Sequence, residues 1–131
     1  MTNKVKNLLN LLNSLCEKLD NNYMINNGGC CYVAYLLAKE LEDLNIPYKF
    51  ITRDGTYHCT IEVEGKLINP IDEEDDINAY DDDKSDYMSE DILEFYENES
   101  WNDTYSRKWN LIVKTIIHSK IKRFIDENSR K

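Results

Sequence analysis

A pair of adjacent cysteines, Cys30 and Cys31, follows two glycines in residues 27–41, which read NGGCCYVAYLLAKEL. The apolar spacing after the pair predicts a helix, so the thiols fall in its first turn. Unpaired N–H groups and the positive end of a helix dipole stabilise a thiolate and can donate to an oxyanion. We therefore expect a nucleophilic cysteine here. The candidate oxyanion and substrate-binding residues are Asn26, Asn27, Gly28 and Gly29, together with the Cys30 N–H.

A nucleophilic cysteine needs a base, and the chain has two histidines. His118 lies in the middle of an apolar-striped C-terminal segment, where a packing or surface role is expected. His58 lies in the β-rich stretch YHCTIEV, and a strand is a rigid place for a general base. We therefore predict that Cys30 and His58 form a nucleophile–base pair.

Asn69 is the predicted third member of the site. A hairpin with a two-residue turn at Glu64-Gly65 places Asn69 diagonally next to His58 on one face of the sheet. Its side-chain amide oxygen is then close enough to accept a hydrogen bond from the imidazole. Asp72 points to the other face in this register, although a bulge at Pro70 would reverse the choice. Asp72 therefore stays open as the alternative.

The elements that must position these residues can be read from their hydrophobic periodicity. Residues 3–19 and 30–45 have apolar residues at helical spacing, and Pro47 closes the second segment. Residues 48–72 change to an alternating period, with two-residue turn signals at Asp54-Gly55 and Glu64-Gly65. Residues 103–126 carry a further apolar stripe. These patterns predict an α+β fold with a three-stranded antiparallel meander and N- and C-terminal helices.

The spacing around Cys30 resembles the transglutaminase-like branch of the papain-like cysteine enzymes. In that family the motif G-x-C-x-x-x-A is followed by L-G-I-P, and here Cys30, Ala34 and residues 44–47 (LNIP) stand at that spacing. The stretch HCTIEV is similar to the family's H-A-W-V-E-V, and Asn69-Pro70 stands where the family usually has Asp-Pro. The resemblance covers about residues 28–70 of the 131.

The resemblance implies a papain-like core, thiol acyl chemistry on amides and a Cys-His-Asn triad without a cofactor. Three positions depart from the family pattern. Asn69 replaces the usual Asp, which orients the imidazole less strongly. Thr60 replaces a Trp, which weakens the case for an aromatic substrate channel. Asn45 replaces a Gly and is expected to act as a left-handed helix cap.

The chain has 131 residues, 41% of them hydrophobic, which predicts one globular domain. We expect a core over about residues 3–72, an acidic linker or lid over about 72–100 and a packing helix over about 103–126. The N-terminal segment lacks the continuous apolar run of a signal peptide, and no stretch approaches transmembrane length. Four cysteines without such a signal indicate thiols in a reducing, cytoplasmic location.

The acidic charge of the chain is concentrated in one segment. The formal net charge is −9, but residues 72–99 contain fourteen Asp or Glu and one Lys, which leaves the remainder of the chain at +4. This balance argues against nucleic acid or an anionic membrane as a partner. An alternative function is therefore a catalytically inactive papain-like fold that binds or inhibits a basic protein through residues 72–99. The enzyme hypothesis instead expects an amide-bearing protein, peptide or small-molecule substrate.

Other interpretations of the same residues compete with this one. Cys31 could be the nucleophile, because Gly-Gly-x-Cys resembles the arylamine N-acetyltransferases, but only numbering from Cys30 reproduces the spacing to Pro47. A zinc site from the cysteines and His58 lacks C-x-x-C spacing. A calcium loop at residues 81–92 has Asp86 where its glycine belongs. We therefore predict neither a metal nor a cofactor.

Overall fold

The computed structural model describes residues 2–26, 30–53, 58–70, 77–82 and 107–129. The elements in chain order are helix α1 (Asn3–Tyr23), helix α2 (Cys30–Asp43), strands β1 (Lys49–Arg53), β2 (Cys59–Val63) and β3 (Lys66–Ile68), the 3-10 turn η1 (Ile77–Ala79), strand β4 (Tyr80–Asp82) and helix α4 (Arg107–Ser129). The chain is thus a mixed α+β protein, as its periodicity predicts.

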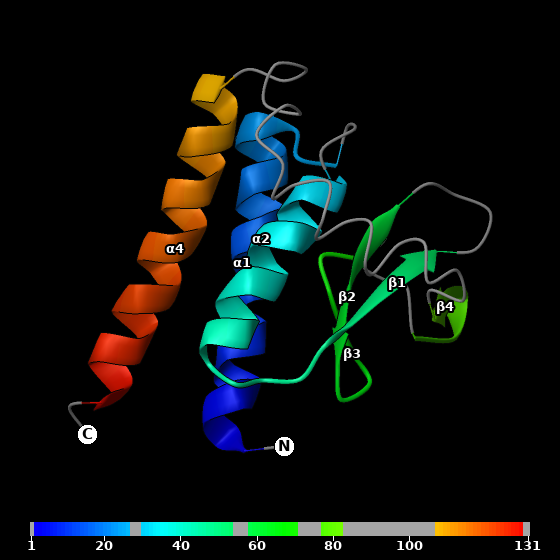
Figure 1. Ribbon diagram of the computed structural model, residues 1–131, viewed down its shortest axis with the longest axis horizontal. Coiled ribbons are helices and arrows are strands. Elements are labelled where there is room, and N and C mark those ends of the chain that lie inside the picture. Colours follow the sequence, from blue (N-terminus) through cyan, green and yellow to red (C-terminus); the bar gives the residue numbers. More distant parts are fainter. Residues whose placement is uncertain (1, 27–29, 54–57, 71–76, 83–106, 130–131) are drawn as a thin grey trace.

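Helices and sheet form separate layers (Figure 1). Helix α2 packs on β2, while α4 packs against both α1 and α2 on the side away from the sheet. Helix α1 also reaches the edge strand β3. The N-terminus of α2, which carries the two adjacent cysteines, therefore lies close to the start of β2.

Helix α1 begins and ends on local signals. The side chain of Thr2 caps its first turn by accepting a hydrogen bond from the Val5 N–H at 3.2 Å. Met24 closes it in the left-handed region, with its N–H donating to the Asp20 carbonyl at 2.9 Å. The helix continues past residue 19 and includes Asp20, Asn21 and Asn22. Its buried face contains Leu8, Leu9, Leu12, Leu15, Cys16 and Leu19.

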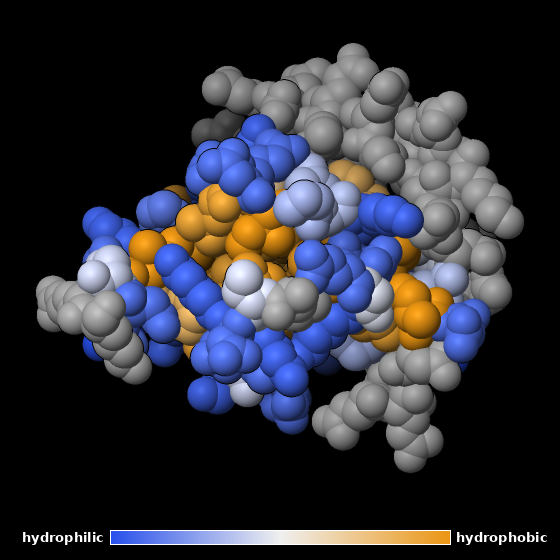
Figure 2. All heavy atoms as spheres, turned by 90° about the horizontal axis from the view of Figure 1, so that it is seen from below, coloured by the Kyte–Doolittle hydropathy of each residue, from blue (hydrophilic) through white to orange (hydrophobic). Residues whose placement is uncertain are grey.

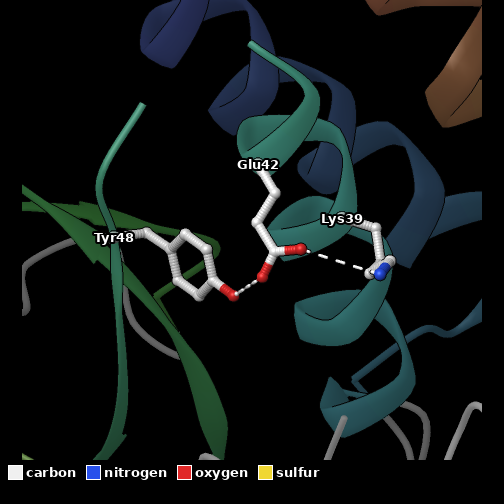
Figure 3. Close-up of polar contacts among 3 residues, drawn as sticks. All are labelled: Lys39, Glu42 and Tyr48. Carbon is white, nitrogen blue, oxygen red and sulfur yellow. Dashed lines mark hydrogen bonds and ion pairs between the residues drawn. The ribbon is translucent and has the colours of Figure 1, made fainter. Parts of the chain in front are cut away.

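Helix α2 ends at Asp43, and Asn45 follows in the left-handed conformation expected from the sequence, with φ 57°. The Ile46 N–H donates to the Leu41 carbonyl at 2.9 Å, which satisfies a helix-terminal acceptor. A polar contact then joins the helix to the first strand. Tyr48 Oη donates to Glu42 Oε1 at 2.6 Å, and Lys39 Nζ lies 3.6 Å from Glu42 Oε2 (Figure 3).

The sheet is antiparallel and has the order β3-β2-β1-β4. Val63 pairs with Lys66 around a two-residue turn in which Glu64 and Gly65 have φ values of 50° and 84°, so the predicted second hairpin is confirmed. The predicted two-residue turn at Asp54-Gly55 is wrong. Thr52 pairs with Cys59, and the Arg53 N–H donates to the His58 carbonyl at 3.0 Å, a register that a two-residue turn cannot give; Asp54 and Gly55 themselves lie outside the described residues.

Strand β4 was not expected from the sequence, which predicts an acidic linker or lid from about residue 72 to 100. Its first residue, Tyr80, pairs with Arg53 of β1 and is buried against Ile51, Leu67 and Ile77. Residues 77–82 thus belong to the sheet layer. The rest of the predicted acidic segment lies outside the described residues, as do residues 103–106 of the predicted C-terminal helix.

The core lies between the helices and one face of the sheet, to which Phe50, Cys59, Ile61, Val63 and Ile68 contribute. On the face shown in Figure 2, a patch of apolar residues is bordered by hydrophilic ones. Partly buried hydrophobic residues pack at the margin of this core. Among the helices that the structure describes, none combines the length and the apolar character needed to cross a membrane.

Candidate functional site

The structure brings Cys30 and His58 together. Cys30 is the first residue of α2 and His58 directly precedes β2, and both are buried, with 8% and 4% of their surface exposed. A hydrogen bond between the two side chains, and another from the backbone of Cys59, lower the pKa of the Cys30 thiol. The N-terminus of α2 therefore carries Cys30 round the end of the sheet to the face that bears His58.

The other side of the imidazole is held by a main-chain group. His58 Nε2 lies 2.7 Å from the backbone carbonyl oxygen of Asn69. A carbonyl oxygen can only accept, so Nε2 must carry a proton. In the neutral ring Nδ1 then has the lone pair, which is the acceptor that a thiol proton requires. The contact with Asn69 thus leaves Nδ1 as the basic nitrogen of the neutral ring.

The side chain of Asn69 does not make the contact predicted for it. Its amide pairs reciprocally with that of Asn26, at 3.0 Å from Asn26 Nδ2 to Asn69 Oδ1 and 2.9 Å from Asn69 Nδ2 to Asn26 Oδ1. The prediction assumed that β3 continued to residue 69, but the strand ends at Ile68 and Asn69 has φ 56°. This left-handed backbone turns the carbonyl, and not the amide, toward His58.

The balance of interactions keeps Cys30 protonated. Its pKa is raised to about 12, first by a hydrogen bond with the Cys31 side chain and then by burial, and the bonds from His58 and the Cys59 backbone offset only part of this. The sequence-based expectation was a thiolate stabilised by the helix N-terminus. The described geometry instead requires His58 to take the proton during attack.

The side chain of Cys31 bonds with two other thiols, those of Cys30 and Cys59. The hydrogen bond with Cys30 lowers its pKa, but a bond with the Cys59 side chain and burial outweigh this and raise it to about 12. A thiol that donates holds its proton more tightly, so these directions fit donation from Cys30 to Cys31 and from Cys31 to Cys59. All four cysteines are free. Cys16, buried in α1, has its pKa raised to about 12 by burial and by Asp20.

The predicted oxyanion group is only partly described. Asn26 lies near the site through its pair with Asn69, and its backbone N–H donates to Asp20 Oδ1 at 3.0 Å. The Asn26 Nδ2 group has a second N–H, so its role toward an oxyanion stays a prediction. Asn27, Gly28 and Gly29 lie outside the described residues, and so does Asp72, the alternative third member.

Two contacts of the site were missed from the sequence. The ring of Tyr80 packs edge-on against the imidazole of His58, with 6.5 Å between ring centroids. The signal for Tyr80 was an aromatic residue within an acidic run, which by itself also fits a solvated face. Asn13 of α1 accepts from the Asn69 N–H at 2.8 Å. Nothing in the sequence singles it out, because 56 positions separate the two residues.

A hollow of about 830 Å³ lies between α1 and the edge strand β3 and reaches Asn26 and Asn69. Its lining includes the polar residues Asn13, Glu17 and Asp20. The hollow therefore adjoins the residues that hold His58, while Cys30 is not part of its lining.

Within the part of the chain that the structure describes, no group of three or more His, Cys, Asp or Glu side chains could hold a metal ion. His118 lies on α4 and contacts Glu40 of α2, with 2.8 Å between Nδ1 and Oε1, far along the chain from the candidate site. Comparisons with protein-family models, with curated proteins and with solved structures found no match.

Proposed function

We propose that this protein is a cysteine-dependent acyl-transfer enzyme that acts on amides through Cys30, His58 and Asn69. The observation that carries the proposal is the linked arrangement of these residues, in which the Cys30 thiol hydrogen-bonds His58 and His58 Nε2 lies 2.7 Å from the Asn69 carbonyl. A nucleophile, a base and a group that orients the base are the parts that such catalysis needs. The transglutaminase-like resemblance of residues 28–70 supports the same reading, and with it a papain-like core.

The reaction begins with proton transfer from Cys30 Sγ to His58 Nδ1. The thiolate then attacks the acyl carbon of the amide, and the carbonyl π electrons move onto oxygen, where the Cys30 backbone N–H donates to the oxyanion. His58 returns the proton to the amide nitrogen as the carbon–nitrogen bond breaks, which leaves a thioester and a free amine. Asn69 stabilises the imidazolium because its carbonyl accepts from Nε2 in both charge states.

The second half of the reaction regenerates the thiol. Attack of water on the thioester releases a carboxylate, and the enzyme is then a peptidase, amidase or deamidase. Attack of an amine forms a new amide, and the enzyme is then a transglutaminase-like acyltransferase. In either case His58 takes the proton of the attacking group and returns it to Cys30. The hollow beside Asn26 and Asn69 offers space for a part of the acyl donor or acceptor next to this site.

The experiment is alkylation with chloroacetamide at pH 7, with the modified positions mapped by mass spectrometry. We expect Cys30 to react faster than Cys16 and Cys59, which have 1% and 0% of their surface exposed. In His58→Gln the side-chain amide can still donate to the Asn69 carbonyl but cannot accept the thiol proton. Cys30 labelling should therefore fall about 100-fold or more in that variant.

The controls separate loss of the base from loss of the fold. Circular dichroism and the thermal midpoint show whether His58→Gln remains folded, and Cys16→Ala removes a buried thiol of α1 away from the site. Equal and slow labelling of all cysteines in the wild type would contradict the proposal. Labelling of Cys31 in preference to Cys30 would move the nucleophile to the neighbouring residue.

A second candidate function is binding of a basic protein by residues 72–99, and the charge of −13 in this segment favours it. It is compatible with the first, because an acidic segment in the same chain as an acyl-transfer site would recruit basic substrates. Without activity at Cys30, the same charge supports an inhibitor or sequestering protein.

A further inference from the structure

Asn69 is held in a conformation that its own sequence neighbours do not impose. It follows the last residue of β3 with φ 56°, a left-handed conformation that asparagine tolerates better than most residues but that still needs support. The direction of its carbonyl depends on this backbone. Whatever fixes Asn69 therefore also fixes the acceptor of His58 Nε2.

The side chain of Asn13 provides that support from helix α1. Its Oδ1 accepts from the Asn69 N–H at 2.8 Å, and its Nδ2 donates to the Leu67 carbonyl at 3.0 Å. The Asn13 amide thus bonds both the Asn69 N–H and the Leu67 carbonyl at the outer edge of β3. A neighbouring strand would bond such main-chain groups in the same way. The adjacent Leu12 has no exposed surface, so the helix that carries Asn13 is anchored in the core.

Asn26 holds the same residue from a second direction through the reciprocal pair of side-chain amides. Asn69 is therefore bound at its N–H by Asn13, at its side chain by Asn26 and at its carbonyl by His58. The two asparagines leave the backbone of Asn69 little freedom to rotate.

We propose that Asn13 is a positioning residue of the candidate site, which acts through the Asn69 backbone to hold His58 in the tautomer and orientation required by Cys30. This inference rests on the proposed function for its catalytic meaning. It makes α1 a working part of the site, in addition to its packing role. Asn13 also lies in the wall of the hollow between α1 and β3 that reaches Asn26 and Asn69.

The test compares Asn13→Ala with Asn10→Ala. Asn10 lies nearly one turn earlier on α1 and contacts Lys66 at the other end of β3, so its replacement is a matched control that spares Asn69. Nitrogen-15 spectra of the ring of His58 report which nitrogen carries the proton. We expect the Nε2–H form to dominate in the wild type and in Asn10→Ala, and to lose population in Asn13→Ala.

Alkylation of Cys30 by chloroacetamide gives the second readout, as a rate against pH. Asn13→Ala should slow it about 10-fold, the lower end of the usual effect of an outer partner, whereas Asn10→Ala should stay within about twofold of wild type. Asn13→Asp retains the acceptor for the Asn69 N–H and loses the donor to Leu67, so it should recover part of the rate. If Asn13→Ala does not fold, Asn13→Asp is compared with Asn10→Asp by the same two measurements.

The spectrum of His58 and the alkylation rate of Cys30 test different claims. An unchanged His58 spectrum in a folded Asn13 variant overturns the positioning role, even where Cys30 is reactive. An unreactive Cys30 in the wild-type protein overturns the proposed function. Even then, a His58 tautomer that changes only in the Asn13 variants supports the structural link from α1 to His58.

Discussion

At the scale of single residues, two side-chain hydrogen bonds have opposite effects on the pKa of the Cys30 thiol, one with Cys31 and one with His58. The bond with Cys31 is the largest cause of the raised pKa of Cys30, and it opposes thiolate formation. The vicinal cysteine is therefore a restraint on reactivity, whereas His58 promotes it. This opposition can be tested because the two partners can be replaced one at a time.

Replacing Cys31 by alanine should lower the pKa of Cys30 from its value of about 12. Alkylation of Cys30 at pH 8 should then speed up roughly threefold for each unit by which the pKa falls, because a tenfold gain in thiolate is partly offset by weaker nucleophilicity. Cys31→Ser retains a hydrogen-bonding group and should have a smaller effect. Cys16→Ala is the control, and slower Cys30 alkylation in Cys31→Ala would contradict the assignment.

Without His58 as a base, the rate of Cys30 alkylation should rise with pH. With a pKa of about 12, the Cys30 thiol is protonated throughout the neutral range, and only the thiolate reacts. In folded His58→Gln, alkylation of Cys30 should therefore rise about tenfold per pH unit above neutrality without levelling off before pH 10. A plateau near pH 7 in this variant would show that Cys30 ionises without His58.

Asn69 offers a separate test of main-chain orientation. Asn69→Gly retains the carbonyl and adopts φ 56° easily, whereas Asn69→Ala is strained in that region. Both variants lose the pair with Asn26, so we expect Asn69→Gly to keep more of the Cys30 alkylation rate than Asn69→Ala, which also loses about 1 kcal/mol of stability. If both variants lose the rate equally, the side-chain amide is the orienting group after all.

The proximity of Cys30 and His58 could be predicted from the sequence, while their roles as nucleophile and base stay predictions. Cys30 and His58 were predicted as a pair from spacing, and the structure places them in contact. The role of the Asn69 carbonyl was not predictable from the strand register, because the register assumes that the strand continues. Asn13 could not be found either, since a polar residue on a helix face shows no partner until the tertiary contact exists.

At the scale of elements, periodicity predicted the helices and the three-stranded meander because each buries one apolar face. It failed for β4, a three-residue strand with the sequence Tyr-Asp-Asp inside an acidic run. It also misplaced the register of β1 and β2, because an Asp-Gly pair is a local signal, whereas the pairing of Thr52 with Cys59 depends on the whole sheet. Short elements on a sheet edge depend on pairing with their neighbour more than on local pattern.

The junction of α2 and β1 depends on the bond from Tyr48 to Glu42. Tyr48→Phe keeps the edge-on contact with Phe50, at 5.4 Å between ring centroids, and removes only the hydroxyl. Because the contact is exposed, we expect a loss of no more than about 1 kcal/mol in the free energy of unfolding. Tyr48→Ala should cost more, since it also removes the ring packing. Urea titration of the three proteins measures the difference.

This junction should also respond to pH. Burial, and then the bond and the negative charge of Glu42, raise the pKa of Tyr48 above its usual value of about 10. The folded state thus favours the protonated phenol, so this stabilisation is complete below pH 10 and is lost as the pH rises above it. The wild type should lose stability between pH 10 and 11 more steeply than Tyr48→Phe. Parallel curves would contradict a raised pKa.

At the scale of the whole molecule, charge is divided between the acidic residues 72–99 and the rest of the chain, which carries +4. Attraction between exposed charges falls steeply with ionic strength, because the Debye length shrinks from about 30 Å at 0.01 M to about 8 Å at 0.15 M salt. We therefore expect the intact protein to bind a lysine-rich peptide at low salt and to release most of it at physiological salt.

Replacing Asp81, Asp82 and Asp83 by asparagine should weaken this binding severalfold at 0.01 M salt, because it removes three of the charges that raise the local concentration of a cation. Replacement of Glu17, Asp126 and Glu127 by their amides removes the same number of charges elsewhere and is the matched control. Fluorescence anisotropy of a labelled peptide measures both. Equal losses in the two triple variants would mean that net charge alone attracts the peptide, and unchanged binding in both would remove the basis for a basic partner.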